Sequence, residues 1–137
     1  MLLGVYKNNT LIQSYSCEDK ASESLAKLCE KALKSYDIKE FIYTNSPGSY
    51  MSIKFTYVFL KALCLVKNIK LRAVLAFEFN NHTPIKALAK KYFKIQNDKI
   101  YLDFLGEDKI DDFILPQNLS KIKKSEDTLP RYILAPV

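Results

Sequence analysis

The sequence has few side chains that could bind a metal ion or form disulfide bonds. It contains one histidine, His82, and three cysteines, Cys17, Cys29 and Cys64, with no CxxC pair. Structural zinc sites combine four closely spaced Cys or His ligands, so we predict no metal site and no cofactor. An odd set of widely spaced cysteines is typical of a reducing compartment, and residues 1–8 lack the basic start of a signal peptide. We therefore expect a cytoplasmic protein.

Long apolar runs and arginine are also scarce. Lys54, Lys61 and Lys67 interrupt the longest apolar stretch, so no segment is predicted to cross a bilayer. The net charge is +6 at pH 7, yet only Arg72 and Arg131 are arginines, and the bidentate contacts that arginine makes with phosphates and bases are mostly missing. We expect no membrane contact, and only weak or indirect binding to nucleic acid.

The composition is that of one folded domain. The chain has 137 residues, of which 48% are hydrophobic and 26% are charged. Short apolar runs at 2–6 and 11–15, separated by Asn8 and Asn9, predict a hairpin at the start of the chain. Apolar residues at spacings of three and four then predict an amphipathic helix over 21–36.

The middle of the chain alternates between strand and helix patterns. A β-prone run at 41–44 precedes a stretch at 51–66 that contains no Pro or Gly, and a continuous apolar run follows at 71–77. This order predicts a βαβ unit and hence an α/β fold. A second hairpin is predicted from 92–95 and 100–104.

The helix predicted over 51–66 has apolar residues on two faces. At about 100° per residue, Lys54 and Lys61 mark a narrow stripe that can face water. One apolar arc consists of Met51, Phe55, Phe59, Ala62 and Val66. The other consists of Ile53, Tyr57, Leu60 and Cys64. A sheet can cover one arc, whereas the other needs either a protein partner or cover from the first helix or the C-terminal segment.

The turn before this helix has the sequence SPGSY at 46–50 and allows two interpretations. Ser46, Gly48 and Ser49 are candidates for an anion-binding turn, because backbone N–H groups at a helix N-terminus attract negative charge. The alternative is a tight turn in which Ser49 caps the helix. The sequence has neither the lysine of a GxxxxGK[ST] loop nor a GxGxxG series.

No catalytic motif accompanies this turn. The chain has no GxSxG sequence, and His82 lies in a polar stretch typical of an exposed loop. We predict no catalytic residues and a protein that is not an enzyme.

Residues 41–77 resemble the bacterial TsaB (YeaZ) family. That family has a strand, a GPGSFTGxR-like turn, a helix that ends in KGLA, and another strand. Here Pro47, Gly48 and Ser49 match the turn, Tyr50 supplies the aromatic residue, and the helix ends in KALC at 61–64.

The resemblance implies a ribonuclease H-like, actin-like ATPase lobe, in which a mixed sheet is packed with helices. On this basis residues 1–83 form the first lobe. Residues 84–137 form either a reduced C-terminal portion of the same lobe or a rudimentary, truncated second lobe.

The resemblance also implies a role in threonylcarbamoyl-adenosine modification of tRNA. TsaB proteins, which carry a peptidase M22 or glycoprotease label, are non-catalytic relatives of TsaD, and they pair with it through helices while TsaE joins them. The expected partners are TsaD and TsaE homologues, a second copy of the chain when alone, and tRNA only weakly or indirectly. The residues expected at the partner interface are Leu25, Cys29, Met51, Phe55, Phe59 and Ala62. The alternatives are a small nucleotide-binding enzyme of the same superfamily and a lysine-rich RNA-binding module.

Overall fold

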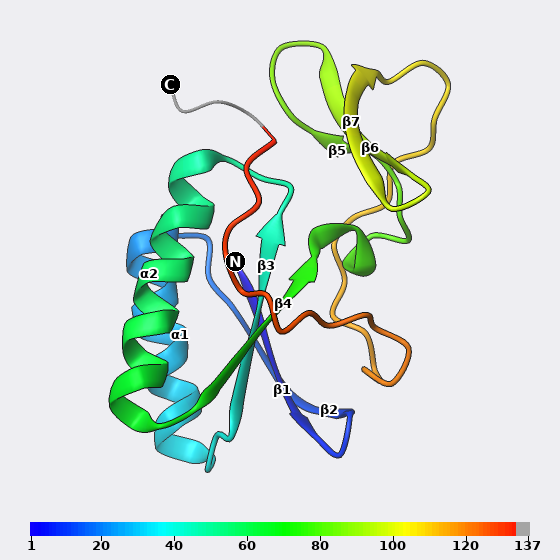
Figure 1. Cartoon of the computed structure of the whole chain (residues 1–137). Helices are drawn as coiled ribbons and strands as arrows, with labels where there is room; N and C mark the ends of the chain where they lie inside the picture. Colours follow the sequence, from blue (N-terminus) through cyan, green and yellow to red (C-terminus); the bar gives the residue numbers. More distant parts are fainter. Residues whose placement is uncertain (134–137) are drawn as a thin grey trace.

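Two helices lie beside a parallel pair of strands in the computed structural model, which describes residues 1–133 (Figure 1). The first elements are β1 (Leu2–Lys7), β2 (Thr10–Ser16), α1 (Ala21–Ser35), β3 (Glu40–Ser46), α2 (Tyr50–Lys67) and β4 (Lys70–Leu75). A short 3₁₀ helix, η1 (Ala76–Phe79), precedes β5 (Ile85–Lys86), β6 (Lys91–Gln96) and β7 (Lys99–Phe104). The predicted α/β class is confirmed. Among the helices of this part of the chain, none has the length and apolar character needed to cross a membrane.

The strands of residues 1–133 form three separate sheets. β1 and β2 pair antiparallel, β3 and β4 pair parallel, and β5, β6 and β7 form an antiparallel sheet in that order. Because α2 connects the parallel strands β3 and β4, the predicted βαβ unit is confirmed. The expectation of one mixed sheet is wrong for this part of the chain, since no hydrogen-bonded ladder joins the three groups.

Both predicted hairpins are present, and their turns explain the pairing. Asn8 and Asn9 have φ values of 52° and 67°, and Asn97 and Asp98 have φ values of 52° and 63°. Two consecutive residues with positive φ match the right-handed twist of antiparallel strands, and Asn and Asp tolerate this conformation better than other non-glycine residues. The turns therefore fix the register in which β1 meets β2 and β6 meets β7.

Helix α2 begins and ends at residues that suit those positions. The Ser49 hydroxyl accepts a hydrogen bond from the backbone N–H of Ser52 at 3.2 Å, which makes Ser49 the N-cap. Asn68 adopts the left-handed conformation, with φ of 56°, and ends the helix. The predicted bounds of the helix differ from the observed ones by a single residue at each end.

Strand β4 ends earlier than the sequence predicts. The apolar run at 71–77 indicated a strand up to residue 77, but pairing with β3 stops at Leu75. The chain then turns through η1, where Phe77 is 0% exposed and its carbonyl accepts hydrogen bonds from the backbone N–H groups of Asn80 and His82. The apolar character of this part of the run reflects burial of the 3₁₀ helix rather than strand pairing.

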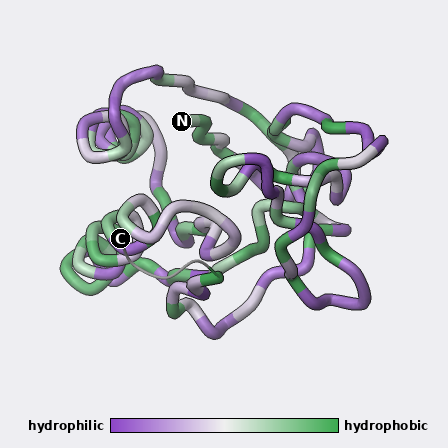
Figure 2. The backbone as a smooth tube through the Cα atoms, turned by 90° about the horizontal axis from the view of Figure 1, so that it is seen from above, coloured by the Kyte–Doolittle hydropathy of each residue, from purple (hydrophilic) through white to green (hydrophobic). Residues whose placement is uncertain are grey.

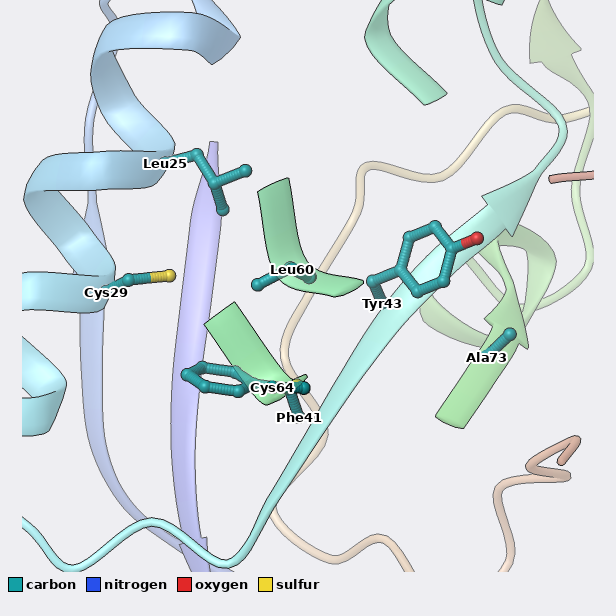
Figure 3. Close-up of a cluster of buried hydrophobic side chains, with 7 residues drawn as sticks. All are labelled: Leu25, Cys29, Phe41, Tyr43, Leu60, Cys64 and Ala73. Carbon is teal, nitrogen blue, oxygen red and sulfur yellow. The ribbon is translucent and has the colours of Figure 1, made fainter. Parts of the chain in front are cut away.

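The central core lies between the helices and the β3–β4 pair (Figure 3). Its members come from α1, β3, α2 and β4, and all are 9% exposed or less. They are Leu25, Cys29, Phe41, Tyr43, Leu60, Cys64 and Ala73. The βαβ unit and α1 therefore share one continuous apolar interior.

The segment after β7 returns to the N-terminal part of the chain. Gln117 accepts a hydrogen bond from the backbone N–H of Leu11, and Ser125 exchanges two backbone hydrogen bonds with Ala73 of β4. In Figure 1 this returning segment, drawn in orange and red, passes beside β4 and the C-terminal half of β3. Residues after 83 thus contact residues before 83, and a division of the chain at this point stays a prediction.

Burial of the core thiols predicts a loss of stability in alkaline solution. Cys29 is 2% exposed, and this burial raises the pKa of its thiol from 9.0 to about 11. Between pH 9 and pH 11 the folded chain holds a proton that the unfolded chain has lost, so the free energy of unfolding falls as the pH rises. A Cys29→Ala variant should lack a part of this fall on the order of 2 kcal/mol. Urea unfolding at about pH 8 and about pH 10.5 measures it.

A Cys17→Ala variant is the matched control, because Cys17 is only partly buried and lies outside the core. It should keep the pH dependence of the unchanged chain. The same pH dependence in the Cys29→Ala variant would contradict the prediction.

Candidate functional site

An apolar face of α2 is open to solvent. Met51 is 70% exposed, Val58 is 56%, Leu65 is 72% and Val66 is 82%. Phe55 lies among them at 36% exposure, and Ala62 is also exposed. The six residues fall on one side of the helix at about 100° per residue. We call Met51, Phe55, Val58, Ala62, Leu65 and Val66 the α2 face.

The two phenylalanines of α2 are one turn apart and stack on each other. The ring centroids of Phe55 and Phe59 are 6.2 Å apart, and the planes are inclined by 25°. Phe59 is half-buried, whereas Phe55 is at the surface. Phe59 thus supports Phe55 from the inner side, and only the outer ring is available for contact with another molecule.

The opposite side of α2 is buried within the chain. Ile53, Leu60 and Cys64 are 6%, 3% and 5% exposed. Figure 2, which looks along the helices, shows hydrophobic colour around most of α2, whereas α1 is hydrophilic on its outer side. A helix that is apolar all round is normally covered all round. Here residues 1–133 cover one side and leave the other in water.

Two neighbours cover the flanks of α2. On one flank α1 packs against it. On the other flank lies the segment that follows Ser125: Tyr43 donates a hydrogen bond from its hydroxyl to the carbonyl of Thr128, and the rings of Tyr50 and Tyr132 have centroids 4.4 Å apart. The first helix and the C-terminal segment, which were the two elements expected to cover α2 from within the chain, thus both contact it. Within residues 1–133 they do so at its flanks and not over the α2 face.

The prediction that Leu25 and Cys29 contribute to a partner interface is wrong. They are 5% and 2% exposed and belong to the central core. In Figure 3 both side chains point from α1 toward the interior. The physical reason is that α1 lies beside α2 and uses its apolar stripe to cover the chain's own strands. Of the other predicted residues, Met51, Phe55 and Ala62 are exposed and Phe59 is half-buried.

The SPGSY turn has the geometry of a capped helix start. Ser49 accepts hydrogen bonds both through its hydroxyl, from Ser52, and through its carbonyl, from Ile53. A Cβ at Gly48 would lie 3.3 Å from the side chain of Ile53, so a larger residue here would require a small shift of Ile53. Ser46 belongs to β3 and is 0% exposed, so it is not available to an anion in solution. Of the three candidate residues of this turn, the structure leaves Gly48 and Ser49 near the surface.

His82 lies in the polar loop between η1 and β5. His82 Nε2 lies 3.8 Å from a carboxylate oxygen of Glu78, one turn earlier in the chain. Asn81 donates a hydrogen bond to Asp111, which holds the pKa of that carboxyl below its usual value. Across residues 1–133, no group of three or more His, Cys, Asp or Glu side chains is placed to hold a metal ion.

The sequence suggested the C-terminal segment as cover for α2 but did not predict the hydrogen bonds that residues 125–132 make with β3. Asn45 is 4% exposed, and its side-chain amide donates to the carbonyl of Leu129 at 3.0 Å, while the backbone N–H of Arg131 donates to the carbonyl of Asn45. The only signal in the sequence was the apolar LPRYI at 129–133. This signal indicates that the segment packs against another part of the chain but not that it bonds to β3.

We compared the chain with models of protein families, with curated proteins and with solved structures, and found no match.

Proposed function

We propose that this chain is a non-catalytic partner of a TsaD-type protein in threonylcarbamoyl-adenosine modification of tRNA. In this role it binds TsaD through the α2 face, with TsaE joining the pair, and it acts in the cytoplasm. The chain performs no chemical step itself. When TsaD is absent, the α2 face pairs with its counterpart on a second copy of the chain.

The proposed fold is a ribonuclease H-like, actin-like ATPase lobe. The order of hairpin, helix, strand, helix and strand over residues 2–75 supports it, together with the parallel pairing of β3 and β4. The SPGSY turn supports it as well, because it connects β3 to α2, which is its position in the TsaB pattern.

The observation that carries the proposal is the exposure of the α2 face. Burying a large apolar side chain contributes roughly 1.5–3 kcal/mol, and soluble monomers rarely leave several such side chains together in water. Four of the six residues of the α2 face are more than half exposed. A partner that covers them recovers this free energy, and association through helices is what the TsaB resemblance implies.

Size-exclusion chromatography with light scattering tests the proposal. The purified chain and the TsaD homologue of the same organism, mixed at about 20 µM each, should elute as one complex, because a functional partner binds well below this concentration. The chain alone should elute as a dimer. Separate elution of the two proteins at this concentration would overturn the proposal.

Calorimetry with ATP and Mg²⁺ separates the scaffold from an enzyme of the same superfamily. The isolated chain should give no binding heat, since the residues at 46–50 cap a helix and Ser46 is buried. Saturable binding of the nucleotide would favour the enzyme instead. In cells that lack the chain, tRNA should lose threonylcarbamoyl-adenosine, which mass spectrometry of tRNA nucleosides detects.

A further inference from the structure

The sheet formed by β5, β6 and β7 carries an open cleft of about 540 Å³. The residues that line it are Leu88, Ala89, Lys90, Lys91, Leu102 and Phe104. The cleft lies at one end of the sheet, where the loop between β5 and β6 meets the last residue of β7. No step of the proposed function uses it.

The loop at 87–90 is held in a fixed shape. The backbone N–H of Ala87 donates to the carbonyl of Lys91 at 3.1 Å, and the backbone N–H of Lys91 donates to the carbonyl of Leu88 at 2.9 Å. Ala89 has φ of 55°, a conformation that is uncommon for a residue other than glycine. The loop places Leu88 and Lys90 on the wall of the cleft.

An exposed aromatic ring lies beside a lysine in this cleft. Phe104 is 60% exposed, and the Nζ atom of Lys91 lies 6.0 Å from its ring centroid. A second pair of this kind, with the Nζ atom of Lys86 5.3 Å from the ring centroid of Tyr92, lies on the opposite face of the sheet and outside the cleft. Aromatic rings next to cationic side chains on a sheet are the means by which many proteins bind unpaired bases and the phosphates between them.

Most lysines of this sheet lack a carboxylate partner. Lys94 is neutralised, because its Nζ lies 2.6 Å from Asp108 and 3.9 Å from Asp103. Among residues 1–133, no carboxylate lies within 4.0 Å of the other lysines between 86 and 99. These lysines are Lys86, Lys90, Lys91 and Lys99. Of these, only Lys90 and Lys91 line the cleft, because strand alternation places Lys86 and Lys99 on the opposite face of the sheet. The cleft therefore combines two lysines that have no carboxylate partner in residues 1–133 with an apolar lining, which complements phosphates that carry flat bases.

We propose that this cleft binds single-stranded nucleic acid, with a base stacked on Phe104 and phosphates at Lys90 and Lys91. The identification of that nucleic acid as RNA rests on the proposed function. The alternative of an anionic lipid surface is less well supported, since only Leu88 and Phe104 present large exposed apolar side chains in the cleft.

Fluorescence anisotropy with a labelled single-stranded RNA of about 12 nucleotides tests the inference. The unchanged chain should bind with a dissociation constant of about 10 µM in low salt, and affinity should fall as salt rises. A Phe104→Ala variant should bind about fivefold more weakly or worse, with an unchanged salt dependence, because it loses stacking and no charge. In a Lys90→Ala/Lys91→Ala variant the plot of log affinity against log salt concentration should become shallower by about 1.4, because two phosphate contacts are lost.

A Lys20→Ala/Lys31→Ala variant is the control, because it removes the same charge from exposed positions at the start of and within α1. It should leave the slope and the affinity within about twofold of the unchanged chain. Equal losses in the control and in the cleft variants would overturn the inference, as would retained binding in both cleft variants. Binding to phosphatidylglycerol vesicles without binding to RNA would also overturn it.

The two proposals fail separately. Phe55→Glu, on the α2 face, should leave RNA binding unchanged, and Phe104→Ala should leave co-elution with TsaD unchanged. RNA binding without a TsaD complex would overturn only the proposed function. A TsaD complex without RNA binding would overturn only the cleft.

Discussion

A Phe55→Glu variant is expected to lose the complex with TsaD, with affinity lower by at least about 30-fold, or about 2 kcal/mol. Phe55 lies in the middle of the α2 face, and its ring rests on Phe59 at a centroid distance of 6.2 Å. A carboxylate at this position would be removed from water on binding without a partner charge, which is costly. Titration of TsaD with the fluorescently labelled chain measures the change.

Phe55 suits this test better than its neighbour. Because Phe55 is 36% exposed, a glutamate in its place can reach solvent in the free chain. Phe59 is half-buried, so a charge at that position would also disturb folding. Lys31→Glu, on the exposed side of α1, is the matched control and should bind as the unchanged chain does. If circular dichroism shows that Phe55→Glu is folded and its affinity for TsaD is within threefold of that of the unchanged chain, the α2 face is ruled out as the interface.

Phe77→Ala should lower the free energy of unfolding by about 3–5 kcal/mol. Phe77 is the largest side chain of η1 that is fully buried, and η1 packs against β3. Removing the ring leaves a cavity that the surrounding strands cannot close. Urea unfolding followed by circular dichroism measures the loss.

The control for this variant is Ile114→Ala, at a position that is 65% exposed and lies outside the α2 face. It should change the free energy of unfolding by no more than about 0.5 kcal/mol. A loss below about 1 kcal/mol for Phe77→Ala would mean that η1 is not part of the cooperative core.

Local patterns predicted the elements well because their causes are local. The two asparagines at 8 and 9 determine a turn by their tolerance of positive φ, and Ser49 starts a helix by accepting one hydrogen bond from three residues ahead. The separation of the strands into three sheets was not predictable in this way. It depends on contacts between residues far apart in the sequence, and one of these, the bridge between Ala73 and Ser125, places a non-strand segment beside β4.

The candidate site was predicted in part for a related reason. Periodicity identified α2 as a helix with two apolar faces, and the structure leaves one of them in water. Periodicity cannot say which apolar residues a neighbouring element will cover. Leu25 and Cys29 were therefore assigned to an interface, although α1 uses them to complete the chain's own core.

The segment at 125–132 affects how the chain is made. A ribosome synthesises this segment after β3, α2 and β4, the elements that it covers. Until then the nascent chain displays the outer edge of β4 and the unpaired amide of Asn45 together with the α2 face. Unpaired strand edges and apolar helix surfaces are what molecular chaperones bind. Once this segment has been synthesised it covers the edge of β4 and the amide of Asn45, whereas the α2 face stays exposed.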